Sequence, residues 1–359
     1  YIASIRQSFL KYIIKSAGLA AVPEYWNSQM KAVYNINPRN KLIFNAVTGS
    51  DYVIIEDESR PDLKGAENVE HSGGQYTIGL TYKSLFSENG YYLLSIGKTA
   101  SRWVADVYDI KYGNKDTYFS RDNVESDNFI KGDVVYKFSP TVEFSVGING
   151  KYGEYTRRET IDPDTIYYYQ YEQLEPNATL DDYYQMVEAY PDYESDALLD
   201  TSNGIGVINK GFDVSDDGKF LKSAVYSQVK FNWHPLLFTA GLRFDNIPYN
   251  STSVVSPRAG ASLSLSPVTK INAAAGLYYQ TPYYWMLMNK NNPYPLKNSY
   301  TKQQVLGIEH LFADDIKGTL EIYNKTYHQR PVYIAETTSD NLDDRLGFTD
   351  TGEGRARGL

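Results

Sequence analysis

The chain has 359 residues and a net charge of -9, and it contains 34 Tyr, 14 Phe and 4 Trp but no Cys. Its mean hydropathy of -0.47 excludes a bundle of membrane-spanning helices, each of which needs about 20 consecutive apolar residues. It does not exclude a membrane barrel, where only every second residue of a strand faces lipid. The absence of Cys excludes disulfides, thiolate metal sites and cysteine nucleophiles.

An apolar residue recurs at every second position along most of the chain, which predicts β-strands. Between residues 141 and 150, for example, Val142, Phe144, Val146 and Ile148 fall on one face of the strand and polar residues fall on the other. The predicted strands cover residues 2–9, 26–37, 41–55, 75–83, 91–109, 128–138, 141–150, 219–233, 237–247, 254–266, 270–279, 302–312 and 317–330.

The connections between these strands alternate in length. The short ones carry Asn, Asp, Pro or Gly, which are turn residues, at 37–40, 87–90, 139–140, 234–235, 266–267 and 314–315. The long ones cover about 57–72, 111–126, 156–216, 280–301 and 331–355. Short periplasmic turns and long extracellular loops are typical of a bacterial outer-membrane barrel. We therefore expect an all-β, antiparallel transmembrane β-barrel, with about 13–14 strands in this chain.

The longest connection, 156–216, is acidic. It holds 14 Asp or Glu against 3 Lys or Arg, so the rest of the chain carries a net charge of +2. Calcium prefers carboxylate ligands, so one interpretation of this segment is a calcium site. The alternative is a loop that its charge keeps solvated. We predict no other metal or cofactor, because the four His residues lack metal-ligand spacing.

Five segments in the second half of the chain carry a resemblance to a known family. They are Val254–Arg258, Ser266–Pro267, Leu277–Pro282, Leu306–His310 and Gly352–Leu359. Their order and spacing resemble the barrel of the TonB-dependent receptor family, and the resemblance extends over nearly the whole chain.

The resemblance implies a barrel of 22 strands with a plugged lumen. Residues 1–359 are then expected to form a partial barrel domain, without the export signal, the N-terminal plug, its TonB-contacting segment and the last strands. About a third of the barrel would be missing.

The resemblance also implies a function: active import of a scarce nutrient (a siderophore, cobalamin, glycan or peptide) across the outer membrane. The expected partners are outer-membrane lipid, the small-molecule substrate, TonB–ExbB–ExbD acting through the plug, and a surface lipoprotein, but no nucleic acid. A passive porin and a surface-exposed binding or assembly barrel remain alternatives.

Aromatic residues surround Pro282, where the chain leaves a predicted strand. We interpret Tyr278 and Tyr279 as part of an aromatic girdle at the lipid headgroups, with a substrate platform as the alternative. The residues beyond Pro282 should lie above the membrane, where they are candidates for substrate binding. These candidates are Tyr283, Tyr284, Trp285 and Tyr294.

Lys83, Arg243 and Arg258 fall on the polar faces of their predicted strands. We expect them to line the lumen, because a cation on the lipid face costs about 2–4 kcal/mol at the bilayer midplane. There they would contact the plug or an anionic substrate. No phosphate-binding loop and no nucleophile elbow occurs in the sequence, so we predict no catalytic residues and no enzyme activity.

Overall fold

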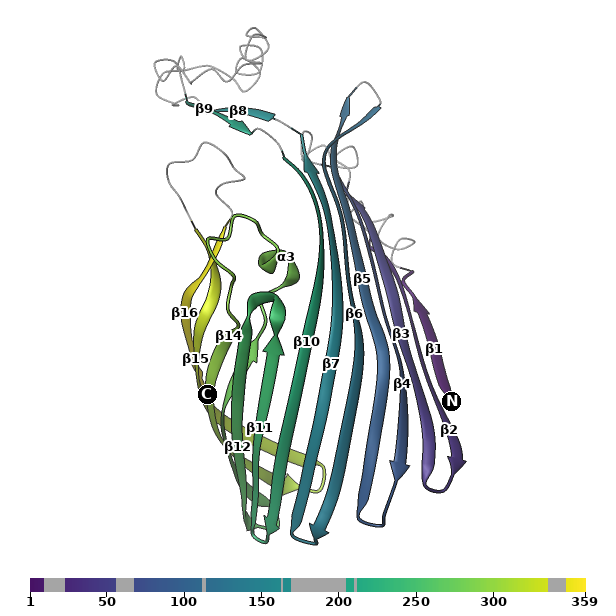
Figure 1. Ribbon diagram of the computed structural model, residues 1–359, viewed down its shortest axis with the longest axis vertical. Coiled ribbons are helices and arrows are strands. Elements are labelled where there is room, and N and C mark those ends of the chain that lie inside the picture. Colours follow the sequence, from purple (N-terminus) through teal and green to yellow (C-terminus); the bar gives the residue numbers. More distant parts are fainter. Residues whose placement is uncertain are drawn as a thin grey trace.

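The computed structural model describes residues 1–9, 23–55, 68–111, 114–162, 164–168, 205–209, 212–334 and 347–359. Fourteen antiparallel strands pair in chain order to form one curled sheet, and the hairpin β8–β9 stands apart from it (Figure 1). The sheet is open, with β1 and β16 as its two edges. This architecture confirms the predicted fold class, a partial antiparallel barrel.

The strands of the sheet are β1 (Ile2–Gln7), β2 (Glu24–Asn37), β3 (Asn40–Ile55), β4 (Asn68–Leu85), β5 (Gly90–Lys111), β6 (Asn114–Ser139), β7 (Val142–Ile161), β10 (Phe212–Trp233), β11 (Leu236–Ile247), β12 (Thr252–Ser266), β13 (Thr269–Gln280), β14 (Ser299–Ala313), β15 (Ile316–Tyr333) and β16 (Phe348–Gly358). The separate hairpin joins β8 (Asp164–Tyr168) to β9 (Ile205–Asn209). The short helices are η5 (Pro248–Asn250) and α3 (Tyr284–Leu287).

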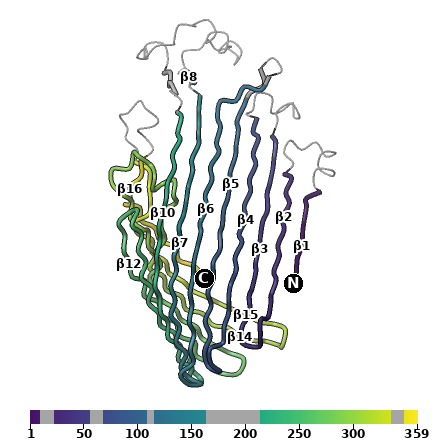
Figure 2. The backbone as a smooth tube through the Cα atoms, turned by 45° about the vertical axis from the view of Figure 1, so that its right-hand side comes forward, coloured from purple at the N-terminus to yellow at the C-terminus, as the bar shows by residue number. Residues whose placement is uncertain are grey.

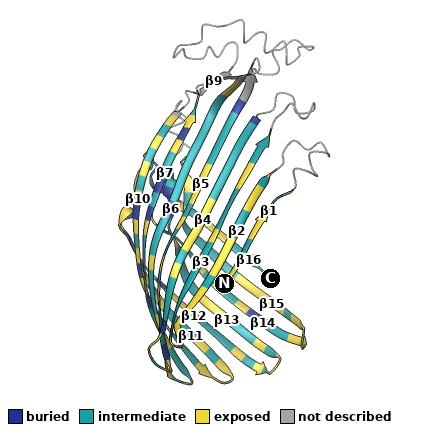
Figure 3. Cartoon of the chain, turned by 90° about the vertical axis from the view of Figure 1, so that its right-hand side faces the viewer, coloured by how far each residue is buried: buried dark blue, intermediate teal, exposed yellow. Residues whose placement is uncertain are grey.

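The outer face of the sheet is apolar and exposed. Exposed and half-buried residues alternate along the strands (Figure 3), and Ile96, Ile130, Ile148 and Val225 are each more than half exposed. So many large aliphatic side chains exposed to water would be unfavourable, so lipid must cover them. The outer face of β5, β6, β7 and β10 is therefore the lipid-facing surface.

This apolar band ends at one level across four strands. Lys98, Asn128, Tyr152 and Leu221 are register partners in neighbouring strands. Beyond this row, outer-face positions turn polar or charged, as at Arg102. The row marks where the strands leave the membrane on the side of the long loops.

Aromatic side chains gather at the opposite end of the band, beside the short turns. Phe86 stacks on Tyr136, and Tyr136 and Phe138 meet edge to face. Phe231 packs near Trp233 on the same strand and near Phe238 across the β10–β11 turn. Such a girdle is typical of the membrane interface of outer-membrane barrels.

Several strands extend further than the sequence predicts. The expected connection 111–126 shrinks to residues 112–113, because β5 and β6 continue on either side of it. The ends of the expected loop 156–216 are strand as well, with Ile161 paired to Phe212. β4 and β16 likewise begin inside the connections expected at 57–72 and 331–355. Above the membrane both faces of a strand meet water, so apolar alternation ends while backbone pairing continues.

The long strands form a tall wall on one side of the molecule (Figure 2). β5, β6, β7 and β10 have 20 to 26 residues, whereas β11 to β14 have 12 to 15. Most of the predicted acidic loop, including 169–204, lies outside the described residues. The tall wall is the part of the sheet that rises furthest above the lipid band.

Candidate functional site

Register partners share a face of the sheet, so they define its inner surface. One row runs from Lys83 through Leu93, Asp133, Gly147, Tyr226 and Arg243 to Ser256. Arg258 follows Ser256 by two positions and therefore shares this face. The structure thus places all three predicted lumen residues, Lys83, Arg243 and Arg258, on the inner face. Contact of these side chains with a plug remains a prediction.

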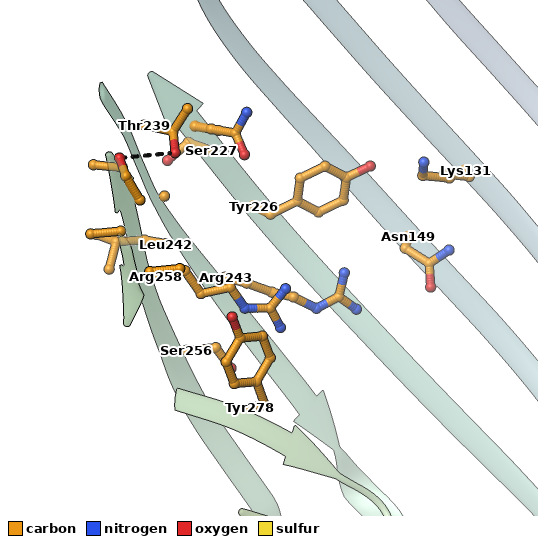
Figure 4. A pocket seen from close by; sticks show the side chains of 16 residues that line it. Lys131, Asn149, Tyr226, Ser227, Thr239, Leu242, Arg243, Ser256, Arg258 and Tyr278 are labelled. Atoms are coloured by element: carbon orange, nitrogen blue, oxygen red, sulfur yellow. Dashed lines mark hydrogen bonds between the residues drawn. The ribbon is translucent and has the colours of Figure 1, made fainter. Parts of the chain in front are cut away.

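A pocket of about 540 Å³ opens on this face between β6 and β13, with Tyr226, Arg243, Arg258 and Tyr278 in its wall (Figure 4). The Arg243 guanidinium donates Nε and Nη2 to Asp245 at 2.7–3.0 Å. The Arg258 guanidinium carbon instead lies 4.5 Å from the centroid of the Tyr278 ring. In the described part of the chain no carboxylate pairs with Arg258, so this cation remains available to an acceptor.

Residues 281–298 form a loop that folds onto the inner side of the tall wall, and α3 lies within it (Figure 1). The Tyr284 ring is 3% exposed and stacks on Phe220 at a centroid distance of 4.0 Å and an angle of 14°. Its hydroxyl donates to Asp127 Oδ1 at 2.7 Å. Lys222 Nζ lies 4.3 Å from the centroid of the same ring. Tyr284 is therefore the anchor of the loop.

The wall is shaped to receive this anchor. A Cβ at Gly153 would lie 2.3 Å from Tyr284 Oη, and a Cβ at Gly218 would lie 2.5 Å from Met288 Sδ. Tyr155, Leu287, Leu296 and Phe348 complete the buried apolar cluster around Tyr284. Burial raises the pKa of the Tyr284 hydroxyl, and hydrogen bonding to the Asp127 carboxylate raises it further. Burial likewise raises the pKa of Tyr155 to about 12.

The far side of the loop is tied to two other elements. Asn250 of η5 donates Nδ2 to the Leu296 carbonyl at 2.8 Å. On β16, Asp350 accepts from the Lys297 backbone N–H at 3.1 Å and from the Tyr294 hydroxyl at 3.2 Å. The loop therefore joins the tall wall to the shorter strands across the inside of the sheet.

The four aromatic residues predicted to bind substrate differ in how far they are exposed. Tyr284 is buried, and both Phe220 and Lys222 lie against its ring, so in this structure its faces are covered. The role of Tyr284 in substrate binding remains a prediction. Trp285 is partly buried and meets Phe348 edge to face. Tyr283 and Tyr294 are 61% and 40% exposed, and their role in substrate binding remains a prediction.

The interpretation of Tyr278 and Tyr279 as one girdle also needs correction. Consecutive residues of a strand point to opposite faces, so only one of them can face lipid. Tyr278 lies in the inner pocket under Arg258, whereas Tyr279 pairs with Tyr300 on the other face.

Higher on the tall wall, a buried carboxylate organises two guanidiniums. Glu159 is 5% exposed and pairs with Arg157 at 2.5 Å and with Arg121 at 2.8 Å. It also accepts from Asn123 Nδ2 at 2.7 Å. Burial alone would raise the pKa of Glu159, but these partners hold it below its ordinary value. The sequence did not reveal this network, because Glu159 falls in a segment expected to be loop.

Trp103 on β5 was also missed. It is 56% exposed on the inner face, where it pairs in register with Asn123. The signal was a large aromatic residue that follows Ser95, Gly97, Thr99 and Ser101 on one face of the predicted strand 91–109.

The described residues hold no group of three or more His, Asp or Glu side chains placed to bind a metal ion. The calcium expectation for the acidic loop falls mainly on residues outside this part of the chain. Among the described helices, none combines the length and apolar character that crossing a membrane requires.

Solved structures that resemble this chain include an outer membrane transporter, a copper transporter and a ferric enterobactin receptor. The outer membrane transporter YddB of Escherichia coli has a TM-score of 0.62 at 11% identity, covering 94% of this chain and 44% of that one. The copper transporter OprC has a TM-score of 0.60 at 11% identity, covering 94% and 50%. The ferric enterobactin receptor PfeA of Pseudomonas aeruginosa, in complex with enterobactin, has a TM-score of 0.60 at 13% identity, covering 94% and 49%.

The chain therefore spans about half the length of these structures. A search of curated proteins gives no match. The family model described as TonB dependent receptor-like, beta-barrel, matches residues 33–359.

An antiparallel sheet with an apolar outer face, an aromatic girdle and a polar inner face defines part of a membrane-spanning β-barrel. The family match identifies which barrel this is: the chain belongs to the TonB-dependent receptor family, as part of its β-barrel. Its location is the bacterial outer membrane, as the sequence predicted.

Proposed function

We propose that the intact protein imports a scarce nutrient across the outer membrane with energy delivered by TonB. The observation that carries this proposal is the family match over residues 33–359. The polar inner wall supports it, because a route for a polar substrate must be lined by hydrogen-bonding groups. Import involves no change to the substrate, so the proposed protein is not an enzyme.

Energy must come from outside the barrel, because no part of the described sheet stores it. The proposed partners are therefore TonB–ExbB–ExbD, acting through a plug in the lumen. Outer-membrane lipid surrounds the barrel, and a surface lipoprotein is a further proposed partner above it. The cargo belongs to the siderophore, cobalamin, glycan or peptide class; the similar structures named above include a copper transporter and a ferric enterobactin receptor.

Uptake by whole cells tests the proposal. A strain lacking the complete gene should lose growth when one nutrient class is limiting, and the intact gene should restore it. The same restoration should fail in a strain without TonB. Uptake that continues without TonB would instead indicate a passive porin. Unchanged uptake in the gene deletion for all four nutrient classes would favour a binding or assembly barrel.

A further inference from the structure

Trp103 offers an exposed aromatic face on the inner wall above the lipid band. Its register row runs from Asp51 through Gly73, Trp103 and Asn123 to Arg157. More than half of the Trp103 surface is exposed. An apolar ring of this size is unusual on a polar face and calls for a partner.

The indole is held in a fixed orientation. His71 Nδ1 lies 2.9 Å from both Trp103 Nε1 and the Val104 carbonyl oxygen, and the Trp103 and His71 rings meet edge to face at 5.6 Å. His71 Nε2 in turn lies 3.2 Å from Asp51 Oδ2. Because its N–H points toward His71, Trp103 presents the face of its ring rather than a donor. A fixed ring also loses little conformational freedom when a ligand binds.

Polar groups stand on both sides of this ring. Neighbouring strands are about 4.8 Å apart, so Asp51 and Arg157, each two strands from Trp103, lie roughly 10 Å to either side. The Asp51 side chain is 57% exposed and can accept hydrogen bonds. Arg157 uses Nε and Nη2 on Glu159, and its Nη1 has no partner among the described residues. A ligand on the ring therefore meets an acceptor on one side and a donor on the other.

The charges of the side chains around Trp103 balance: Arg121 and Arg157 share the single carboxylate of Glu159, and the exposed carboxylate of Asp51 offsets the remaining positive charge. Lys290 of the loop 281–298 pairs with Asp216 at 2.7 Å. An anionic ligand would compete with these carboxylates for their partners. An uncharged ligand rich in hydroxyl groups can use the free hydrogen-bonding atoms and leave the ion pairs intact.

We propose that Trp103 is the stacking platform of a subsite for a neutral sugar ring, with Asp51 and Arg157 as hydrogen-bonding groups at its edges. The C–H face of a sugar packs against the electron-rich face of an indole, while its hydroxyls point outward toward polar groups. This inference rests on the proposed import function and narrows its cargo to the glycan class. Of the residues carrying it, only Trp103 supplies apolar contact.

Binding to the full-length protein, purified in detergent, tests the subsite. The probes are maltohexaose, cellohexaose, xylohexaose and chitohexaose, with ferric enterobactin as the anionic comparison, and calorimetry gives each affinity. At least one hexasaccharide should bind, with an affinity that changes little with salt because the ligand carries no charge. Trp103→Ala should weaken that affinity about tenfold or more, and Trp103→Phe should weaken it less.

Trp26→Ala is the matched control. Trp26 is 43% exposed and pairs with Ser50 on the opposite face of the sheet, so its loss should leave binding unchanged. Heat-modifiable electrophoretic mobility shows that each variant is folded. The subsite is overturned if no hexasaccharide binds, if only ferric enterobactin binds, or if folded Trp103→Ala binds like the parent.

The two proposals fail separately. TonB-dependent uptake without hexasaccharide binding would keep the import function and reject the subsite. If hexasaccharide binding needs Trp103 but uptake does not depend on TonB, TonB-energised import is rejected and the subsite is kept.

Discussion

Gly153 and Tyr284 fit each other at the scale of single residues. Gly153 has no side chain where the Tyr284 hydroxyl approaches the wall, and Asp127 lies beside that space and accepts a hydrogen bond from the hydroxyl. Neither the glycine nor the tyrosine is distinctive in the sequence. Their contact forms only when distant parts of the chain come together, since Asp127 and Tyr284 are 157 positions apart.

Gly153→Ala should therefore release the loop 281–298. The new methyl group would overlap Tyr284 Oη, and overpacking of this kind costs about 1–3 kcal/mol. Chymotrypsin should then cleave the loop faster at Tyr283 and Trp285 in the folded protein. Gly74→Ala is the matched control, because the nearest atom to its Cβ is 4.0 Å away. Equal cleavage rates in both variants would show that the packing of Tyr284 against Gly153 does not hold the loop in place.

Glu159 provides a second prediction at this scale. Glu159→Gln leaves Arg121 and Arg157 without their shared carboxylate, and we expect a loss of about 2 kcal/mol in the free energy of unfolding. Thermal unfolding of the purified protein at pH 7 measures this loss. Asn149→Gln, on the inner face of the same strand, is the control variant, and it should change the free energy of unfolding little.

The loss should also depend on pH in one direction. The folded-state pKa of Glu159 is lowered, so its contribution is complete above the unfolded value of 4.5. That contribution disappears as the pH falls through the lower folded-state value. The gap between parent and Glu159→Gln should therefore narrow in acid. A gap that widens below pH 4.5 would contradict the assigned ion pairs.

At the scale of elements, the sequence predicted the membrane-embedded part of the fold well. All six predicted short turns occur between consecutive strands, and Asn37 accepts from the Arg39 N–H at 3.0 Å as a turn residue should. Alternation is readable there because lipid on one face and a polar interior on the other impose it. Above the band that constraint ends, which explains why the upper parts of β4, β6 and β16 were expected to be loop.

The candidate site was less predictable for a related reason. Alternation assigned Lys83, Arg243 and Arg258 to one face, and the structure places all three there, with Arg243 and Arg258 in one pocket and Lys83 several strands away. It could not show that the loop 281–298 folds inward and buries Tyr284, because that depends on Phe220, Gly153 and Asp127 from other strands. Tertiary contacts of this kind have no local pattern.

The two faces of β7 yield a prediction at this scale. Ile148 is 59% exposed on the outer face, and its neighbour Asn149 lines the inner pocket. Ile148→Arg should cost about 2–4 kcal/mol and reduce folding of the full-length protein into lipid vesicles. Asn149→Arg places the same charge one residue away, on the polar side, and should fold like the parent. Equal folding of both variants would contradict the assignment of faces.

At the scale of the whole molecule, the sheet is asymmetric about the membrane. Short turns and an aromatic girdle form one end, and the tall wall with the loop 281–298 forms the other (Figure 1). Arg258 lies deeper than Trp103, because its register row runs through Gly241 and Gln228 to Ser145, below the upper limit of the lipid band. A substrate entering from outside would therefore meet Trp103 and Tyr283 before it met Arg258.

This orientation can be measured with single cysteines, because these 359 residues contain none of their own. Tyr283 lies in the inward-folded loop and Glu88 in the turn between β4 and β5, and both are exposed. In intact cells making the full-length protein, a membrane-impermeant maleimide should label Tyr283→Cys and leave Glu88→Cys unmodified. Permeabilising the outer membrane should then make Glu88→Cys reactive, while the protein without an added cysteine sets the background. Labelling of Glu88→Cys in intact cells, with Tyr283→Cys protected, would invert the orientation. Trp103 would then face the periplasm, where it could not be the first contact for an incoming ligand.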